Sequence, residues 1–405
     1  MTTSAPPSAK AERLHALDAV RGFALLLGIF YHAAISFLPF APQIWIVADN
    51  HPSETLSIFV FASHSFRMTT FFLIAGFFAH LSYHRLGAAG FIRDRARRIA
   101  LPLVVGWPIV TLAFGVIVAT SALVANQGRL PSPPAPSAVV SQLSLAHLWF
   151  LYVLLELYAV TLLLRAVMAA VDRTGRVEAG IDRIMTTVAS SRLAPFALAL
   201  PAAAALLADP DWTTWPNIRT PEHLITNLQA WVAYGVAFGF GFLLHRQPRL
   251  IWSLQPRWPL NMALAIVSIA ACFGLMDVSS GVDANLLRLA RALCYAIAGW
   301  SATLAIIGAA LRFLSGASAT RRYIADASYW LYIVHMPIVI ALQLALARLD
   351  WPWPAKYAAI VSITLAIGFV SYQTLVRYGR IGAVLNGPRS RQKQTPQHVA
   401  RAEPV

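Results

Sequence analysis

Residues 17–38, LDAVRGFALLLGIFYHAAISFL, form a block that is long and apolar enough to cross a lipid bilayer as one helix. Similar blocks recur along the chain, and we expect ten spanning helices. Their predicted ranges are 17–39, 56–81, 99–124, 145–169, 193–208, 224–245, 258–276, 286–312, 323–347 and 356–377. The block at 193–208 is short and interrupted by prolines, so it is compatible with half a span or a re-entrant segment.

The composition excludes an ordinary soluble protein. Of the 405 residues, 58% are hydrophobic and 12% are charged, whereas roughly 25% of the residues in a soluble domain are charged. The apolar residues come in long blocks rather than in the short alternating strands of a transmembrane barrel. The predicted fold class is therefore all-α, a polytopic integral membrane protein of about ten transmembrane helices.

The net charge is +15. Most lysines and arginines lie between apolar blocks, on the side that both termini would share, and the positive-inside rule makes that side cytoplasmic. This distribution favours membrane orientation over nucleic-acid binding, so we expect no nucleic-acid partner. Cys272 and Cys294 lie inside apolar blocks and are predicted to be packing residues, and we predict no metal site.

The chain is divided into three parts. We expect residues 1–16 to be a cytoplasmic segment without the features of a signal peptide, so that the first apolar block is retained as a helix. Residues 17–385 are predicted to form a single transmembrane domain, and the basic residues 386–405 a disordered cytoplasmic tail with weak attraction to anionic lipid. The Pro- and Ser-rich stretch 126–141 is interpreted as a linker or a lid on the outer side.

Ionisable residues inside predicted spans indicate function, because they are costly to bury in a membrane. In the first block, Asp18, Arg21 and His32 recur at helical spacing and share one face. This face connects the cytoplasmic surface to the outer half of the membrane. An alternative interpretation is that Asp18 and Arg21 pair at the interface and that His32 bonds a neighbouring helix.

Three further blocks carry polar groups to the same depth. The run SHSFRMTTFFLIAGFF contains His64 and Arg67, HLWFLYVLLELY contains His147, Trp149 and Glu156, and ASYWLYIVHMP contains His335. We expect His147 at the outer boundary, Trp149 in the aromatic belt there, and the other groups in one layer with His32. A histidine beside a carboxylate is suited to general-base catalysis of proton removal from a hydroxyl group.

Arginines occur in two other notable places. RDRARRIALP, residues 93–102, lies on the cytoplasmic side and includes Arg95 and Arg98, whose guanidinium groups suit phosphates. Topology alone also explains such a basic loop. Arg288 and Arg291 near the outer end of a predicted span are expected to snorkel to the interface, or alternatively to bind an anion.

Several motifs are absent. We find no P-loop, GxGxxG, GxSxG or HExxH pattern, which leaves nucleotide hydrolysis, dinucleotide chemistry and serine or zinc hydrolysis without support. Gly235, Gly239 and Gly241 recur at helical spacing and predict close helix packing.

The chain resembles the membrane acyltransferase family 3, and within it the glucans biosynthesis protein C group, which modifies periplasmic glucans with succinyl groups. The segments LDAVRG, SHSFRMTTFFLIAGFF, RARRIALP, HLWFLYVLLE and YIADASYWLYIVHMP carry the resemblance and run in family order across nearly the whole chain. Members of the family have ten helices and move an acyl group from cytoplasmic acyl-CoA to a sugar hydroxyl at the outer face.

The resemblance implies roles for particular residues. An Arg-x10-His pair falls on Arg21 and His32, with His32 the catalytic histidine, and an Arg-x-x-Arg element falls on Arg95 and Arg98, implied to meet the phosphates of CoA. Glu156 joins His32 as an expected catalytic residue. Expected substrate-binding residues are Arg21, Arg67, His64, His147, Trp149 and His335.

The leading hypothesis is thus a bacterial inner-membrane O-acyltransferase that uses acyl-CoA as donor substrate, without a permanently bound cofactor. Its expected partners are acyl-CoA on the cytoplasmic side, a glycan on the outer side and membrane lipids, with a homo-oligomer possible in principle. The alternatives are a proton-coupled transporter or exporter, because intramembrane His, Glu and Arg also build proton relays, and a non-catalytic scaffold of envelope synthesis. The acyl group, succinyl or acetyl, stays open at this point.

Overall fold

The computed structural model describes residues 15–125, 144–212, 217–278 and 281–387, and within these ranges the chain is helical and has no strand. The predicted all-α class is confirmed. The termini 1–14 and 388–405 and the whole 126–141 stretch lie outside the described residues, so the expectations made for them stay predictions.

The described residues of the first half of the chain, up to residue 171, are mostly helical. Its elements are α1 (His15–Ile35), α2 (Ala41–Ile44), α3 (Glu54–Arg95), the π-helical turn η1 (Ala96–Ala100), α4 (Leu101–Ala125), the 3-10 turn η2 (Ala146–Leu148) and α6 (Trp149–Val171). Gly87 has a φ of 68° and breaks the long stretch between the predicted spans 56–81 and 99–124.

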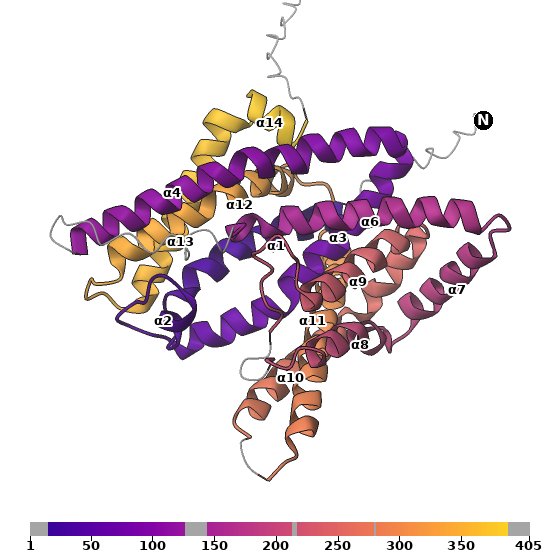
Figure 1. Cartoon of the computed structure of the whole chain (residues 1–405), viewed down its shortest axis with the longest axis horizontal. Coiled ribbons are helices and arrows are strands. Elements are labelled where there is room, and N and C mark those ends of the chain that lie inside the picture. The colour runs from indigo at the N-terminus through magenta and orange to yellow at the C-terminus, as the bar shows by residue number, and fades with distance from the viewer. Residues whose placement is uncertain (1–14, 126–143, 213–216, 279–280, 388–405) are drawn as a thin grey trace, which may run out of the picture.

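The second half continues in the same way. Its elements are α7 (Arg176–Ser190), α8 (Ala194–Leu207), α9 (Leu228–Leu244), the 3-10 segment η3 (Pro248–Arg257), α10 (Trp258–Met276), α11 (Ala284–Phe313), α12 (Ala319–Leu346), α13 (Trp353–Ser371), η4 (Tyr372–Val376) and α14 (Arg380–Leu385). Figure 1 shows α10 and α11 as a pair that projects from the other helices.

The described residues contain seven helices that are long and apolar enough to cross a membrane, or eight if the bent pair of α7 and α8 counts as one. This agrees with a polytopic membrane protein but does not confirm a count of ten. The ranges 56–81 and 99–124 fall in one helical stretch, Glu54–Leu123, and α9 is a shorter apolar helix. The block at 193–208 corresponds to α8, which meets α7 at 111°, in line with the half-span interpretation.

Helix α7 was not predicted from the sequence, because it is amphipathic rather than apolar. A bidentate pair holds it in place: the Arg246 guanidinium donates to both carboxylate oxygens of Asp182 at 2.9 Å and also pairs with Glu178.

Local sequence signals explain where several helices begin. Ser53, Asn227, Asp283 and Ser318 accept hydrogen bonds from the backbone N–H groups of the first turns of α3, α9, α11 and α12, respectively. The described ends of the chain lie close together, because His15 lines a small recess with Asp326, whose carbonyl accepts from the Asn386 side chain.

Glycine allows α3 and α9 to cross at backbone contact. A Cβ on Gly241 would lie 1.8 Å from the carbonyl oxygen of Leu73, and one on Gly76 would lie 2.0 Å from that of Phe238. The predicted close packing is confirmed at Gly241. It is wrong at Gly239, where a Cβ would meet nothing within 4 Å.

The guanidinium groups of Arg288 and Arg291 bind backbone carbonyls, and the expectation that they snorkel to the interface stays a prediction. Arg288 donates to the carbonyls of Leu207 and Asp209 at the end of α8, and Arg291 donates to the Leu275 carbonyl at the end of α10. The last carbonyls of a helix have no partner within it, so a nearby guanidinium group stabilises them.

Candidate functional site

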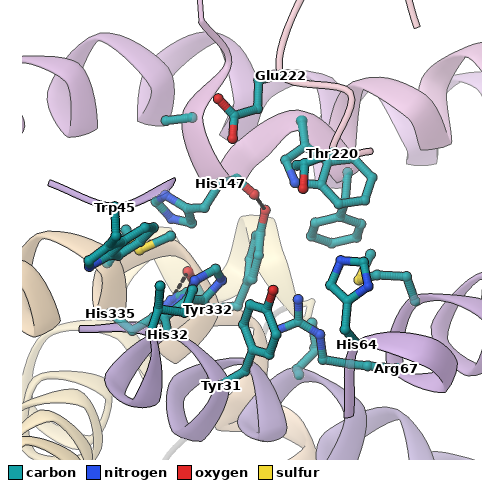
Figure 2. Close-up of a pocket in the computed structure, with 18 of the residues that line it drawn as sticks. Tyr31, His32, Trp45, His64, Arg67, His147, Thr220, Glu222, Tyr332 and His335 are labelled. Atoms are coloured by element: carbon teal, nitrogen blue, oxygen red, sulfur yellow. Dashed lines mark hydrogen bonds between the residues drawn. The ribbon is translucent and has the colours of Figure 1, made fainter. Parts of the chain in front are cut away.

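A cavity of about 510 Å³ lies among α1, α3, α6, α9 and α12 and is partly covered by the loops around residues 44–46 and 217–222. Figure 2 shows its polar side chains converging from these separate elements. Six of the predicted site residues line it: His32, His64, Arg67, His147, Trp149 and His335. These residues, predicted from separate helices, therefore line one cavity.

His32 lies in the last turn of α1, at the centre of a group of rings. Its imidazole centroid is 5.4 Å from that of His335 and 5.9 Å from that of Trp45, with which it is stacked at 19°. Its buried Nδ1 makes no hydrogen bond to any part of the chain that the structure describes. His32 thus has an unsatisfied ring nitrogen in a site that a substrate can enter.

Arg67 gives the cavity a positive wall. The side chain is 8% exposed, and its guanidinium carbon lies 4.3 Å from the centre of the Tyr31 ring. Among residues 15–125, 144–212, 217–278 and 281–387, no carboxylate lies within ion-pair distance of it, and its Nε is buried without a partner. A buried cation of this kind is matched best by an anionic or strongly polarised group of a ligand.

Backbone carbonyls determine which nitrogens of two histidines carry hydrogen. His147 Nε2 lies 3.1 Å from the Ile333 carbonyl, and His335 Nδ1 lies 2.6 Å from the Tyr332 carbonyl. A carbonyl can only accept, so each of these ring nitrogens is the donor. The other nitrogens, His147 Nδ1 and His335 Nε2, are buried without partners in the described chain and present lone pairs.

His64 has a hydroxyl partner instead of a carbonyl. The Tyr295 hydroxyl accepts from the Ile218 backbone N–H at 3.4 Å and lies 3.0 Å from His64 Nδ1. A hydroxyl both donates and accepts, so this contact is compatible with a hydrogen on either ring nitrogen of His64. The cavity therefore has a hydrogen-bond donor from Arg67 and acceptors from His147 and His335.

The chain turns sharply just before His147. Ala146 has a φ of 47°, a conformation that costs energy for a residue with a Cβ. Its N–H donates to the Ser144 hydroxyl at 3.1 Å, and the Tyr332 hydroxyl donates to the His147 carbonyl. These bonds hold the strained turn that aims His147 at the cavity.

Trp149 is not an aromatic-belt residue, so that part of the prediction is wrong. It is 7% exposed and stacks on Tyr234, with 5.7 Å between ring centroids and an interplanar angle of 23°. Trp149 thus lines the cavity instead of facing lipid.

Glu156 and Arg21, which were predicted to lie with His32, are outside the cavity lining. The Glu156 carboxylate accepts from the Thr226 hydroxyl at 2.7 Å, and Arg21 pairs with Asp18 at 3.3 Å and lies over the Phe78 ring. The structure therefore does not bring Glu156 or Arg21 to His32. The Asp18–Arg21 pair agrees with the alternative interpretation of the first helix.

The carboxylate that does line the cavity is Glu222, in the loop between α8 and α9. Figure 2 shows Glu222 and Thr220 in the upper part of the view, above Arg67 and His64. Desolvation raises the pKa of the Glu222 carboxyl, and His223 and a hydrogen bond from Ser144 partly offset this effect. Sequence reasoning missed its role, because an acid in a polar loop has no spacing that reveals it.

Arg95 and Arg98 lie together around Asp94. Arg95 pairs with this carboxylate at 2.8 Å and Arg98 at 2.9 Å, while Arg95 also donates to the Ser82 hydroxyl at 3.1 Å. The Arg98 carbonyl accepts from the hydroxyl of Tyr329, which is one turn before the cavity residue Tyr332 on α12. The arginine segment thus adjoins the helix that forms one cavity wall.

No group of three or more His, Cys, Asp or Glu side chains in the described ranges is arranged to hold a metal ion. The cavity histidines instead use carbonyls and a tyrosine hydroxyl as partners. The arrangement suits proton transfer at a hydroxyl group beside a cation that can meet a developing negative charge.

Comparison with known proteins gives one family. A family model described as an acyltransferase domain matches residues 14–373. Glucans biosynthesis protein C of Escherichia coli (strain SMS-3-5 / SECEC) and that of Shigella dysenteriae serotype 1 are each 32% identical to the chain over 149 residues, which is 36% of this chain and 37% of each relative. The match thus spans little more than a third of these curated relatives. No solved structure matches the chain.

The family model covers every helix that lines the cavity, from α1 to α12. The chain is therefore a multi-pass membrane protein that belongs to the membrane acyltransferase family 3, as the sequence motifs predicted.

Proposed function

We propose that the protein transfers an acyl group from acyl-CoA to a hydroxyl of an envelope glycan, in a bacterial inner membrane. The observation that carries this proposal is the cavity in which His32, with an unsatisfied ring nitrogen, lies among polar groups that include the unpaired Arg67. Family membership supports the acyl transfer, and the names of the relatives support a glucan as acceptor.

His32 acts as the base in this mechanism. It takes the proton of the acceptor hydroxyl while the hydroxyl oxygen forms a bond to the thioester carbonyl carbon. The carbon–sulfur bond then breaks, and the CoA thiolate receives the proton from His32. Transient acylation of His32 is the alternative route, and both routes need the same residue.

Arg67 and His64 meet the negative charge that develops on the carbonyl oxygen. Arg67 is a buried hydrogen-bond donor with no described carboxylate to neutralise it, and His64 is proposed to carry its hydrogen on Nε2 and to donate beside it. A buried donor that is already in place stabilises an oxyanion more strongly than it would in water. The same guanidinium group would also suit the free carboxylate of a succinyl donor.

The acceptor is bound by the opposite set of groups. His147 Nδ1 and His335 Nε2 present lone pairs, which suits the O–H groups of a sugar. Glu222 and Thr220 add further polar contacts on the loop that covers the cavity. We place the acceptor on this side of the cavity.

Arg95 and Arg98 are proposed to bind the CoA phosphates. They form a cluster with Asp94 and adjoin α12 through Tyr329. A phosphate that competes with Asp94 for these guanidinium groups would place the thioester arm toward the cavity wall that contains Tyr332.

The test is mass spectrometry of envelope glycans from four strains, which carry wild-type protein, His32→Ala, His51→Ala or no protein. His51 is the matched control, because it is a partly exposed loop histidine that does not line the cavity. We expect one fixed acyl mass with the wild type and His51→Ala and its loss in the other two strains.

An unchanged glycan acyl mass with His32→Ala, expressed at wild-type level, would refute the role of His32. Identical profiles in all four strains would overturn the glycan acceptor and favour transport, which a vesicle flux assay without CoA would detect. CoA release by protein in nanodiscs tests the donor directly, and its absence would exclude acyl-CoA.

A further inference from the structure

Gln343 is a buried polar residue that does not line the cavity but touches the groups around His32. It lies in the last turn of α12, and its side chain is 1% exposed. A lone glutamine in an apolar helix is unusual enough to be a functional signal, yet its partners cannot be derived from the sequence. All of the hydrogen bonds of its side chain go to residues 32–45.

One end of the amide completes the end of α1. Its Nε2 donates to the carbonyls of His32, at 2.9 Å, and Ala33, at 3.3 Å. The last four carbonyls of a helix have no partner within it. Here the carbonyls of Ala34 and Ile35 are satisfied by following backbone N–H groups, so Gln343 satisfies the remaining two.

The other end of the amide holds the ring that stacks on His32. The Trp45 Nε1 donates to Gln343 Oε1 at 2.9 Å, and the Trp45 ring lies nearly parallel to the His32 imidazole. An indole N–H can only donate and a carbonyl can only accept. The orientation of the amide is therefore fixed, and one side chain positions both the backbone of His32 and its stacking partner.

We propose that Gln343 is a positioning residue for His32, which sets the direction of the imidazole through the α1 carbonyls and through Trp45. This inference rests on the proposed function, in which His32 is the base. Because Gln343 does not line the cavity, its removal changes the geometry of proton transfer and leaves the contacts with either substrate in place.

The experiment compares Gln343→Met with Gln229→Met in nanodiscs, with kcat and KM measured for acyl donor and acceptor. Gln229 is the matched control, since it is 3% exposed, makes side-chain hydrogen bonds to Asp209 and Arg219, and does not line the cavity. We expect Gln343→Met to lower kcat about 10- to 100-fold, with each KM within about twofold of wild type. Gln229→Met should keep the wild-type kcat.

Cooperative thermal unfolding shows that a variant is folded. If Gln343→Met does not unfold in this way, Trp45→Phe provides a second variant. It keeps an aromatic ring at this position of the cavity wall and removes the N–H group that bonds to Gln343. The kcat should therefore fall, and Gln343→Met in addition should lower it no further. A wild-type kcat in both Gln343→Met and Trp45→Phe, an effect confined to KM, or an equal loss in Gln229→Met would overturn the positioning role.

His32→Ala, measured in the same assay, separates this proposal from the proposed function. Full activity of His32→Ala would mean that the base is another group. Loss of activity in His32→Ala together with a wild-type kcat in Gln343→Met would leave the base assignment intact and refute only the positioning role.

Discussion

Replacement of Lys356 by Met should destabilise the protein strongly, because Lys356 is the cation of a fully buried ion pair. Its side chain is 0% exposed, and its Nζ donates to the two carboxylate oxygens of Asp49 at 2.9 and 3.1 Å and to the Ala347 carbonyl at 3.2 Å. The Asp49 side chain is 3% exposed. The substitution would leave this carboxylate buried without its counter-charge.

Removal of one partner of a buried pair costs about 3–5 kcal/mol. At about 2.1 cal/mol/K of unfolding entropy per residue, this corresponds to a fall in Tm of roughly 4–6 °C for a chain of 405 residues. The Asp49 loop also contains Trp45, so the loop that covers the cavity should loosen. Thermal unfolding of purified protein in nanodiscs measures the first effect, and kcat measures the second.

The double variant Lys356→Met/Asp49→Asn is the control. It removes both charges, and the penalty of an unpaired buried charge disappears with them, so most of the lost Tm should return. A single substitution that lowers Tm by less than about 1 °C, or a double variant that is worse than Lys356→Met alone, would refute the reasoning.

Three further predictions follow from the cavity and the helix crossing. Arg67→Met should lower kcat about 10²- to 10³-fold, because the oxyanion loses its hydrogen-bond donor. Arg67→Lys should recover part of this loss, since it restores the charge without the planar guanidinium group. A wild-type kcat in Arg67→Met would contradict the assignment. Glu222→Gln should raise the acceptor KM about tenfold and leave the donor KM unchanged, because only the acceptor side of the cavity loses a carboxylate. A raised donor KM with an unchanged acceptor KM in steady-state kinetics would mean that Glu222 contacts the donor. Gly241→Ala should lower the free energy of unfolding by about 1–3 kcal/mol, because it forces α9 away from the Leu73 carbonyl. Gly239→Ala should leave the stability unchanged or raise it slightly. Equal Tm values for the two variants would count against the close crossing of α3 and α9.

Much of the cavity could be predicted from the sequence. His32, His64, Arg67, His147 and His335 each stand in an apolar block, and polar groups in such blocks face the protein interior because lipid cannot solvate them. Helical rise placed His32, His64, Arg67 and His335 at one depth and His147 at the outer boundary, and the structure joins all five in one cavity. Depth alone also suggested Glu156, which the structure places against Thr226 instead.

The residues that the sequence did not reveal depend on contacts between distant segments. Glu222 lines the cavity because its backbone carbonyl accepts from the Leu145 N–H. Trp45 is held over His32 by Gln343, which is 298 positions further along the chain. The spacing of residues in the sequence does not reveal such contacts, because the helices at the two ends of a loop determine where its residues lie. The same reason applies to Arg288, whose carbonyl partners belong to another helix.

The sequence by itself determined that the protein is an all-helical membrane protein of this family, since long apolar blocks can satisfy their backbone groups in lipid only as helices. It also determined which polar side chains must avoid lipid. The tertiary structure alone decided which of them meet, which ring nitrogens carry hydrogen and that Gln343 holds His32, because these depend on how α1, α3, α6, α9 and α12 cross. Helix crossings arise from contacts summed over the whole chain, and no local pattern of residues specifies them.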